Sequence, residues 1–244
     1  MLGIWAHPDD EAFLSAGLMA AARDAGNRVV CVTATLGERG TDDPQRWPPE
    51  RLGAVRALEL RASLAALGVT EHHLLGLVDG TCAAQSHDAM VSRLAGIIRM
   101  VAPDTIVTFG PDGLTGHEDH QTVSAWATSA RAVAAPAARL LYATTTEEFV
   151  EAWEPAREAF DVFLADGLPL RARESELAAQ LRLDDSQLDR KIVALRAQAS
   201  QTTALFAALG EERVRRWWST ETFVAADAAS LGRRPEWGTW RVAA

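Results

Sequence analysis

The stretch Met1-Leu2-Gly3-Ile4-Trp5-Ala6-His7-Pro8-Asp9-Asp10-Glu11 opens the chain and sets an apolar run directly against a polar cluster. Residues 1–6 predict a buried strand, because a short apolar run bounded by a turn is typical of a strand covered on both faces. Pro8 fits the first turn of a following helix, where its missing N–H costs nothing. The imidazole and carboxylate groups of residues 7–11 cannot all be buried unpaired. A bound metal ion would resolve this conflict, since it favours concentrated negative charge.

Strand and helix patterns alternate over the first two thirds of the chain. Further strands are predicted at residues 28–35, 72–75, 105–109 and 139–143, and helices at 11–25, 50–67, 88–100 and 117–134. This order predicts an α/β fold, a Rossmann-like, doubly wound and mostly parallel sheet with helices on both faces. In such sheets the active site lies at the carboxyl ends of the strands, near the point where the strand order reverses.

The last hundred residues have a weaker pattern. They predict a strand at 177–183, one long helix at 187–209 and a last strand at 222–225. We interpret the chain as a single domain over 1–244, with a core at about 1–143 and a small C-terminal elaboration at about 144–244.

Composition limits the partners that the protein can have. A net charge of −9 argues against a nucleic-acid partner, which would require a basic patch. The polar residues 7–11 interrupt the apolar N-terminus before the apolar region of an ordinary signal peptide could form. No apolar run reaches the ~20 residues of a membrane span. Two cysteines, Cys31 and Cys82, are too few for a disulfide framework. We expect a cytoplasmic protein that acts on a small molecule; the sequence allows a homo-oligomer.

A second polar cluster, Gly116-His117-Glu118-Asp119-His120, again follows a predicted strand and a glycine-bearing loop. His7 and Asp10, three residues apart, can project from one side of a helix start. His120 then completes a His₂Asp ligand set with open positions, as in catalytic zinc sites. Non-haem Fe(II) oxygenases use the same kind of ligand set, so the residues leave Zn²⁺ and Fe²⁺ both open.

The neighbours of these ligands favour hydrolysis. Asp9 can take a proton from a water molecule, and His117 can stabilise an oxyanion or protonate a leaving amine. We expect Asp119 to orient His117 through a hydrogen bond. Glu11 and Glu118 are interpreted as ordinary first-turn acids that the helix dipole favours. Packing or surface positions are expected for His72, His73 and His87, and a core position for Cys82. Two functions are open to the tryptophans, stacking on a sugar or apolar substituent and packing in the core or an interface, and packing is the favoured interpretation for Trp217, Trp218, Trp237 and Trp240.

Taken together, the motifs Ala6-His7-Pro8-Asp9-Asp10-Glu11 and Gly116-His117-Glu118-Asp119-His120 resemble those of the LmbE/PIG-L-like N-deacetylases. Arg56-x-x-Glu59, Leu67-Gly68-Val69, Asp79 and the stretch Lys191 to Gln201 extend the resemblance. It implies that His7, Asp10 and His120 bind zinc, with Asp9 as general base, His117 as acid or electrostatic stabiliser and Asp119 orienting it. Arg56 and Asp79 match residues that contact the sugar or its aglycone in the deacetylases of low-molecular-weight thiol biosynthesis.

Two positions depart from the family pattern. Thr115 stands where relatives acting on an inositol-linked sugar carry tyrosine, and Gln198 stands where family members often have histidine. The expected activity is removal of an acetyl group from an N-acetylglucosamine-type conjugate. An amidase for a larger acyl group, a non-haem Fe(II) oxygenase and a binding domain without catalysis stay open as alternatives.

Overall fold

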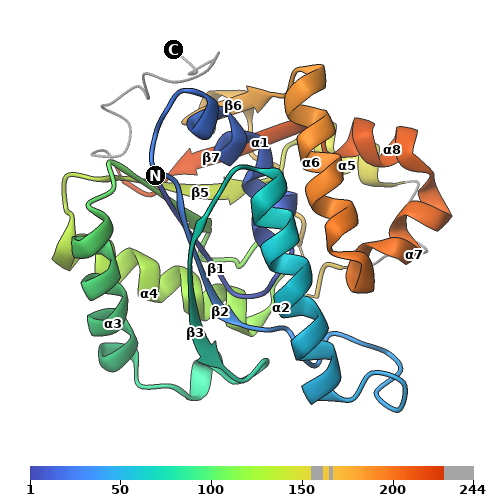
Figure 1. Cartoon of the computed structure of the whole chain (residues 1–244). Helices are drawn as coiled ribbons and strands as arrows, with labels where there is room; N and C mark the ends of the chain where they lie inside the picture. The colour runs from blue at the N-terminus through green and yellow to red at the C-terminus, as the bar shows by residue number, and fades with distance from the viewer. Residues whose placement is uncertain (155–161, 165–166, 228–244) are drawn as a thin grey trace.

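The computed structural model describes residues 1–154, 162–164 and 167–227. Its centre is a seven-stranded sheet in the order β3-β2-β1-β4-β5-β7-β6 (Figure 1). The strands are β1 (Leu2–Trp5), β2 (Val30–Thr35), β3 (Glu71–Leu77), β4 (Thr105–Phe109), β5 (Arg139–Thr144), β6 (Ala179–Arg182) and β7 (Thr220–Ala225). The first five pair in parallel, whereas β7 is antiparallel to both β5 and β6. The predicted α/β, mostly parallel sheet is confirmed.

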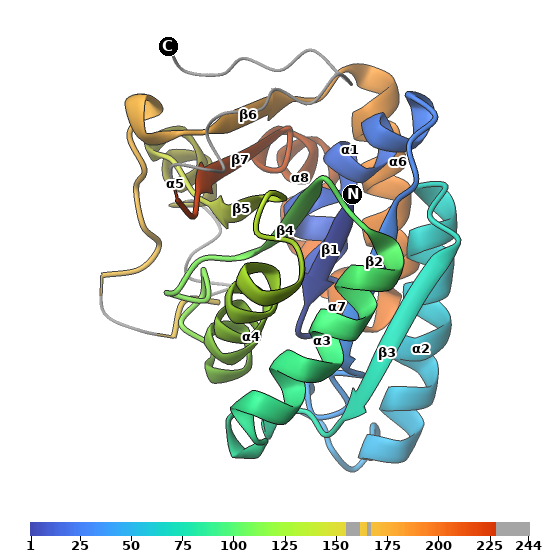
Figure 2. The same ribbon diagram turned by 90° about the vertical axis from the view of Figure 1, so that its left-hand side faces the viewer.

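Helices cover both faces of this sheet. α3 (His87–Val101) and α4 (Glu118–Ala134) pack together on one face, and α1 (Asp10–Asp24), α2 (Pro49–Ala66) and α6 (Asp185–Ala197) pack together on the other (Figures 1 and 2). The strands between these layers are apolar and buried, as their sequences predict. Trp5 and Phe109, both fully buried, meet edge-to-face with their ring centroids 5.0 Å apart.

The strand order reverses at the centre of the sheet, where β1 lies between β2 and β4. The two polar motifs follow β1 and β4, so neighbouring strands deliver both to one edge of the sheet. This is the place at which ligand sites are expected in open α/β sheets.

The C-terminal part departs from the prediction in its helices. The expected single helix at 187–209 is wrong: the structure has α6 and a separate α7 (Ala199–Leu209), which meet at Gln198. The φ and ψ angles of Gln198 are −85° and 45°, outside the helical range, and its side chain is buried. Two short helices, α5 (Glu147–Trp153) and α8 (Glu211–Trp217), were not predicted. The tryptophans Trp237 and Trp240 lie outside the described residues.

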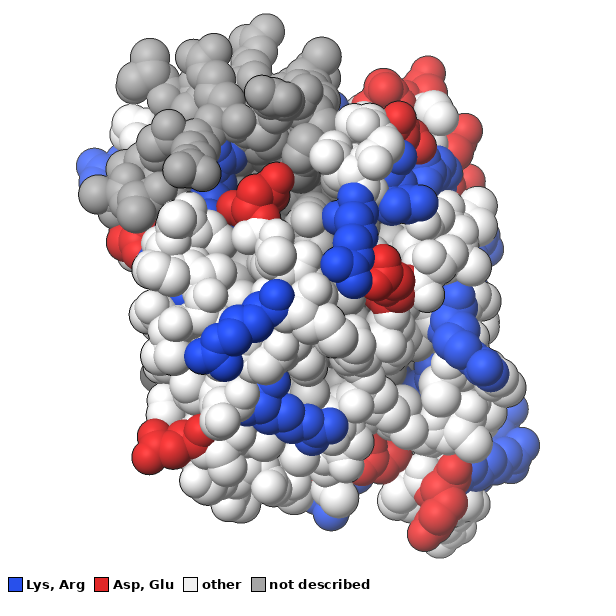
Figure 3. All heavy atoms as spheres, turned by 60° about the vertical axis from the view of Figure 1, so that its left-hand side comes forward, with Lys and Arg blue, Asp and Glu red and all other residues white. Residues whose placement is uncertain are grey.

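The surface in Figure 3 carries arginines that are separated from one another by uncharged and acidic side chains. Within the described part of the chain, no helix is both long and apolar enough to cross a membrane.

Candidate active site

His7 and Asp10 are held by the turn between β1 and α1. Asp10 is the first residue of α1, and its Oδ2 accepts a hydrogen bond of 2.7 Å from the backbone N–H of His7. This contact closes the turn and sets the two side chains side by side, with His7 Nδ1 3.9 Å from Asp10 Oδ2. Both residues are buried.

His120 reaches the same point from α4. Its Nε2 lies 3.1 Å from His7 Nδ1 and 3.5 Å from Asp10 Oδ1. On the other side of the ring, Nδ1 lies 2.9 Å from the carbonyl oxygen of Gly113, to which it can only donate. This hydrogen bond sets the tautomer and leaves the Nε2 lone pair facing His7 and Asp10. The ring of Phe109 stacks on His120 at a centroid distance of 4.1 Å and fixes its plane.

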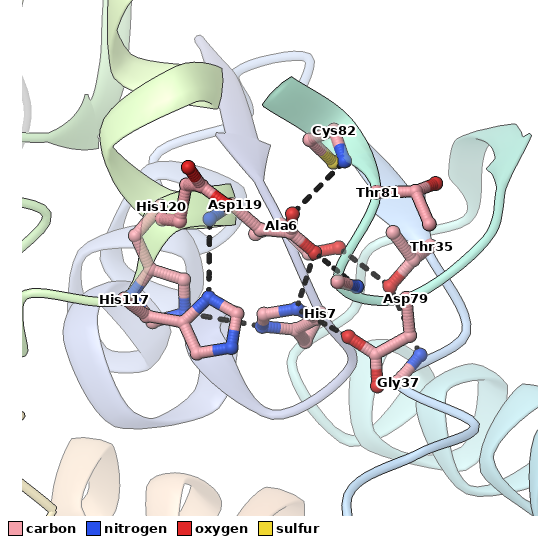
Figure 4. A network of polar contacts seen from close by, with 12 residues as sticks. Ala6, His7, Thr35, Gly37, Asp79, Thr81, Cys82, His117, Asp119 and His120 are labelled. Atoms are coloured by element: carbon pink, nitrogen blue, oxygen red, sulfur yellow. Dashed lines mark hydrogen bonds and ion pairs between the residues drawn. The ribbon is translucent and has the colours of Figure 1, made fainter. Parts of the chain in front are cut away.

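Two carboxylates hold the far side of His7. Its Nε2 lies 3.0 Å from Asp79 Oδ1 and 3.3 Å from Asp119 Oδ2 (Figure 4). Burial alone would lower the pKa of His7, but the hydrogen bonds to Asp119 and Asp79 and the nearby carboxylates raise it to about 10. Without a metal this raised pKa keeps both ring nitrogens protonated. With Nε2–H held by the two carboxylates, the proton that a metal would displace is the one on Nδ1, the arrangement in which a carboxylate orients a metal-binding histidine.

The donor set fits a transition metal. His7 Nδ1 lies 3.1 Å from His120 Nε2 and 3.9 Å from Asp10 Oδ2, and His120 Nε2 lies 3.5 Å from the other carboxylate oxygen, Asp10 Oδ1. Two imidazole nitrogens and a carboxylate oxygen suit zinc, and iron(II) is also compatible with them. Nitrogen atoms of His7, His117 and His120 also lie within 4.8 Å of one another, as do ligand atoms of His7, Asp79 and Asp119. In the group of His7, Asp79 and Asp119, the carboxylate of Asp119 already accepts hydrogen bonds from the backbone N–H groups of Gly80 and Cys82.

Asp9 has an unusual backbone conformation. Its φ angle of 97° lies in the left-handed region that residues other than glycine rarely adopt. Its side chain, 19% exposed, lies 3.1 Å from the guanidinium of Arg56. Burial raises the pKa of Asp9 to about 7, although the positive charge of Arg56 opposes this rise. A carboxylate with these properties can exchange a proton near neutral pH.

Arg56 lines the site and also holds the surrounding backbone in place. It is only 3% exposed, and its guanidinium donates to the carbonyl oxygens of Gly37 and Pro8 in addition to Asp9. A Cβ at Gly37 would lie 2.2 Å from Arg56 Nη1, and the φ angle of Gly37 is +58°. Arg56, for which a substrate contact was expected, therefore makes structural contacts that the sequence did not indicate. Asp79 likewise contacts His7 and accepts from the backbone N–H of Arg39.

The expected orientation of His117 by the carboxylate of Asp119 is wrong. That carboxylate faces His7, and it is the backbone N–H of Asp119 that donates to His117 Nδ1 at 3.1 Å (Figure 4). His117 is the N-cap of α4, so this contact is a helix cap. Because Nδ1 accepts, a neutral His117 carries its proton on Nε2.

Glu11 is more than the first-turn acid that its position predicted. It is fully buried, and its Oε1 accepts hydrogen bonds from Ser63 Oγ and Gln198 Nε2. Its Oε2 accepts from the backbone N–H of Asp9 at 3.0 Å, so Glu11 supports the strained residue directly. Nothing in the local pattern reveals this role, because Ser63 and Gln198 are distant in sequence.

Residues of the candidate metal site and apolar side chains line one cavity of about 360 Å³. The lining residues from the two motifs are His7, Asp9, Asp10, His117 and His120, and those with polar side chains from elsewhere include Arg56, Asp79, Thr115 and Gln201. Trp217 and Trp218, for which packing was the favoured expectation and stacking on a substrate the alternative, are buried and also line this cavity.

Comparison with known proteins identifies the family. The family model described as PIG-L, GlcNAc-PI de-N-acetylase, matches residues 2–131, which is more than half of the chain. A 1D-myo-inositol 2-acetamido-2-deoxy-alpha-D-glucopyranoside deacetylase of Actinosynnema mirum is 36% identical over 233 residues, covering 83% of this chain and 81% of that protein. The chain belongs to the PIG-L family.

Solved structures share the fold of this PIG-L family member. The N,N'-diacetylchitobiose deacetylase from Pyrococcus horikoshii has a TM-score of 0.62 at 20% identity, covering 92% of this chain and 82% of that one. GalB, a 4-carboxy-2-hydroxymuconate hydratase from Pseudomonas putida, has a TM-score of 0.65 at 18% identity, covering 96% and 97%. Because one is a deacetylase and the other a hydratase, the fold does not select the reaction.

The two departures from the family pattern lie beside the site. Thr115 Oγ1 is 3.3 Å from His120 Nδ1, so this smaller side chain contacts a candidate ligand of the PIG-L site. Gln198 hydrogen-bonds to Glu11 at 2.9 Å from the junction of α6 and α7. Thr115 and Gln198 therefore each contact a residue of one of the two motifs, and the sequence alone did not indicate these contacts.

Proposed function

We propose that the protein is a zinc-dependent deacetylase that hydrolyses the acetamido group of an N-acetylglucosamine-type conjugate. The observation that carries the proposal is the convergence of His7 Nδ1, His120 Nε2 and the Asp10 carboxylate in a cavity that Asp9 and His117 also line. The deacetylases named among the relatives support the reaction class.

In this proposal His7, Asp10 and His120 hold the zinc. When bound, zinc supplies a Lewis acid that polarises a carbonyl group and lowers the pKa of water. Asp79 and Asp119 keep the proton of His7 on Nε2, and the carbonyl of Gly113 keeps that of His120 on Nδ1. Once His7 has lost its Nδ1 proton on metal binding, both imidazoles direct a lone pair at the shared site.

Asp9 is the proposed general base. Arg56 and Glu11 fix its side chain and its backbone, so the carboxylate is held in one position before the substrate arrives. It takes the proton from the attacking water and can later return it toward the leaving amine. His117 offers the Nε2–H to the oxygen of the amide carbonyl as negative charge develops there.

The other functions considered from the sequence receive less support. An Fe(II) oxygenase has no evident use for the paired roles of Asp9 and His117, and the curated relatives are deacetylases. An amidase for a longer acyl group uses the same catalytic residues, so substrate comparison is needed to separate it from a deacetylase.

The test is amine release from N-acetylglucosaminides by the zinc-loaded protein. Asp9→Asn should retain zinc and lose about 100-fold or more of the rate, because a positioned base contributes that much. His120→Ala should lose zinc as measured by metal analysis. Glu118→Gln is the matched control, since this exposed residue lies between His117 and Asp119 in the sequence and should keep both zinc and rate. Full activity of Asp9→Asn would exclude the proposed base.

A further inference from the structure

The cavity that holds the candidate metal site has two chemically different sides. Asp9, Arg56, Asp79 and Gln201 contribute polar groups near the strand ends. The apolar side is larger and is formed by Phe13, Leu14, Leu114, Phe149, Val162, Phe163, Leu205, Trp217 and Trp218. A substrate that fills this cavity must therefore present an apolar surface as well as a polar one.

Four rings on the apolar side form a continuous aromatic wall, consisting of Phe13, Phe149, Trp217 and Trp218. Trp218 has ring centroids 4.8 Å from Phe13, 5.0 Å from Phe149 and 4.8 Å from Trp217, and Phe149 lies 5.5 Å from Trp217. Because each ring packs on at least one other, the wall is held in place before any ligand binds.

The aromatic wall lies next to the metal site. Asp10 is followed by Phe13 and Leu14 three and four residues later on α1, so they lie on the same face of the helix one turn away. Leu114, in the loop that leads to His117, also lines the cavity. A group bound against the wall would therefore be separated from the reacting amide by only a few bonds of the substrate.

The volume of the cavity exceeds the needs of an acetyl group. At about 360 Å³ it falls in the range of sites that enclose drug-sized ligands. If the acyl group is acetyl, as in the proposed function, the apolar side must receive another part of the substrate. A polyol such as inositol would be poorly matched to it, since its hydroxyl groups would lose water without gaining partners.

We propose that the physiological substrate is an N-acetylated amino sugar whose aglycone is apolar and about the size of one or two aromatic rings, and that this aglycone binds against the aromatic wall. This inference rests on the proposed function. The polar side, with Arg56 and Asp79, receives the sugar hydroxyl groups, and the wall selects the aglycone.

The experiment compares kcat/KM of the zinc-loaded protein on a set of glycosides. The set contains the methyl, inositol and 2-naphthyl glycosides of N-acetylglucosamine, together with the methyl glycoside of N-octanoylglucosamine. We expect the naphthyl glycoside to exceed the methyl and inositol glycosides by about tenfold or more, since burying an aromatic group in an apolar site contributes that much. Phe149→Ala should reduce the naphthyl-to-methyl ratio about five- to tenfold. Trp47→Ala removes an aromatic side chain outside the cavity and should leave the ratio unchanged.

The outcomes separate the inference from the proposed function. Equal rates on the methyl, inositol and naphthyl glycosides would overturn the apolar aglycone and leave the deacetylase standing. Preference for the octanoyl amide over all acetyl substrates would overturn both the inference that the acyl group is acetyl and the inference that the aglycone binds the aromatic wall. Amine release from none of the four compounds would overturn the proposed function itself. Because the ratio is measured within the wild-type protein, it remains decisive even if Phe149→Ala fails to fold.

Discussion

Replacing Lys191 by methionine should strongly destabilise the protein, because this residue belongs to a fully buried ion pair. Lys191 Nζ lies 2.8 Å from Glu221 Oε1, and the two side chains are 0% and 1% exposed. Lys191 also donates to the carbonyl oxygen of Phe13, while the Glu221 carboxylate accepts from the backbone N–H groups of Gly17 and Leu18. In an ideal α-helix the Phe13 carbonyl and the Gly17 N–H would bond to each other. Here both bond to the ion pair, which joins α6 and β7 to the middle of α1.

The magnitude follows from what Lys191→Met leaves behind. The Glu221 carboxylate stays buried without its counter-charge, a situation that costs about 3–5 kcal/mol in other proteins. This is a large fraction of the about 5–15 kcal/mol that stabilises a typical domain. Replacing both members, as Lys191→Met with Glu221→Leu, removes both charges, so neither is left buried without its counter-charge. The double variant should therefore lose at least about 2 kcal/mol less than the two single losses combined.

The assay is urea unfolding of the four proteins, followed by tryptophan fluorescence and circular dichroism. Its readout is the free energy of unfolding extrapolated to water. Additive losses in the double variant, or a loss below about 1 kcal/mol for Lys191→Met, would refute the view that Lys191 and Glu221 are a coupled pair joining α6 and β7 to α1.

Three further predictions concern other parts of the molecule. Burial lowers the pKa of His72 to about 4 from the ordinary 6.5, so the unfolded chain binds more protons between these pH values and stability is lost as pH falls through that window. This half-buried residue should account for about 1–2 kcal/mol of the loss in free energy of unfolding between pH 7 and pH 4, measured by urea titration at each pH. His72→Gln should abolish that share of the loss. An unchanged pH dependence in this variant would contradict the assignment. Gly37→Ala should displace the Arg56 guanidinium and lower kcat about tenfold or more with zinc retained, because the new Cβ would lie 2.2 Å from Nη1; a wild-type rate would show that the guanidinium position is unimportant. Glu11→Gln puts an amide group where the carboxylate accepts bonds from Asp9, Ser63 and Gln198, and should lower kcat more than it raises KM; an effect on KM alone would argue against a positioning role.

The sequence predicted the parts of the site that depend on short spacing and on strand order. His7 and Asp10 are close in the chain, and His120 follows the strand that pairs with β1, so a parallel sheet brings the three together. The prediction was correct about their proximity because it needed only the fold class and the rule that sites form at carboxyl strand ends.

The errors arose where long-range contacts override local pattern. Glu11 looks like an acid favoured by the helix dipole, but Ser63 and Gln198 bury it from distant parts of the chain. The same contact explains why the long apolar pattern of 187–209 does not form one helix: Gln198 turns inward to Glu11, and the backbone leaves the helical range there. Asp119 was assigned to His117 by adjacency in sequence, whereas the fold places its carboxylate against His7.

The central claim is that His7, Asp10 and His120 hold a metal on which hydrolysis depends, with the amide placed beside Asp9 and His117. The most direct test is amine release from an N-acetylglucosaminide before chelation, after exhaustive chelation, and after titration with zinc. The account predicts that chelation abolishes the release, that zinc restores it with an end point of one ion per chain, and that His120→Ala cannot be restored. Amine release that persists in the fully chelated wild-type protein would contradict it.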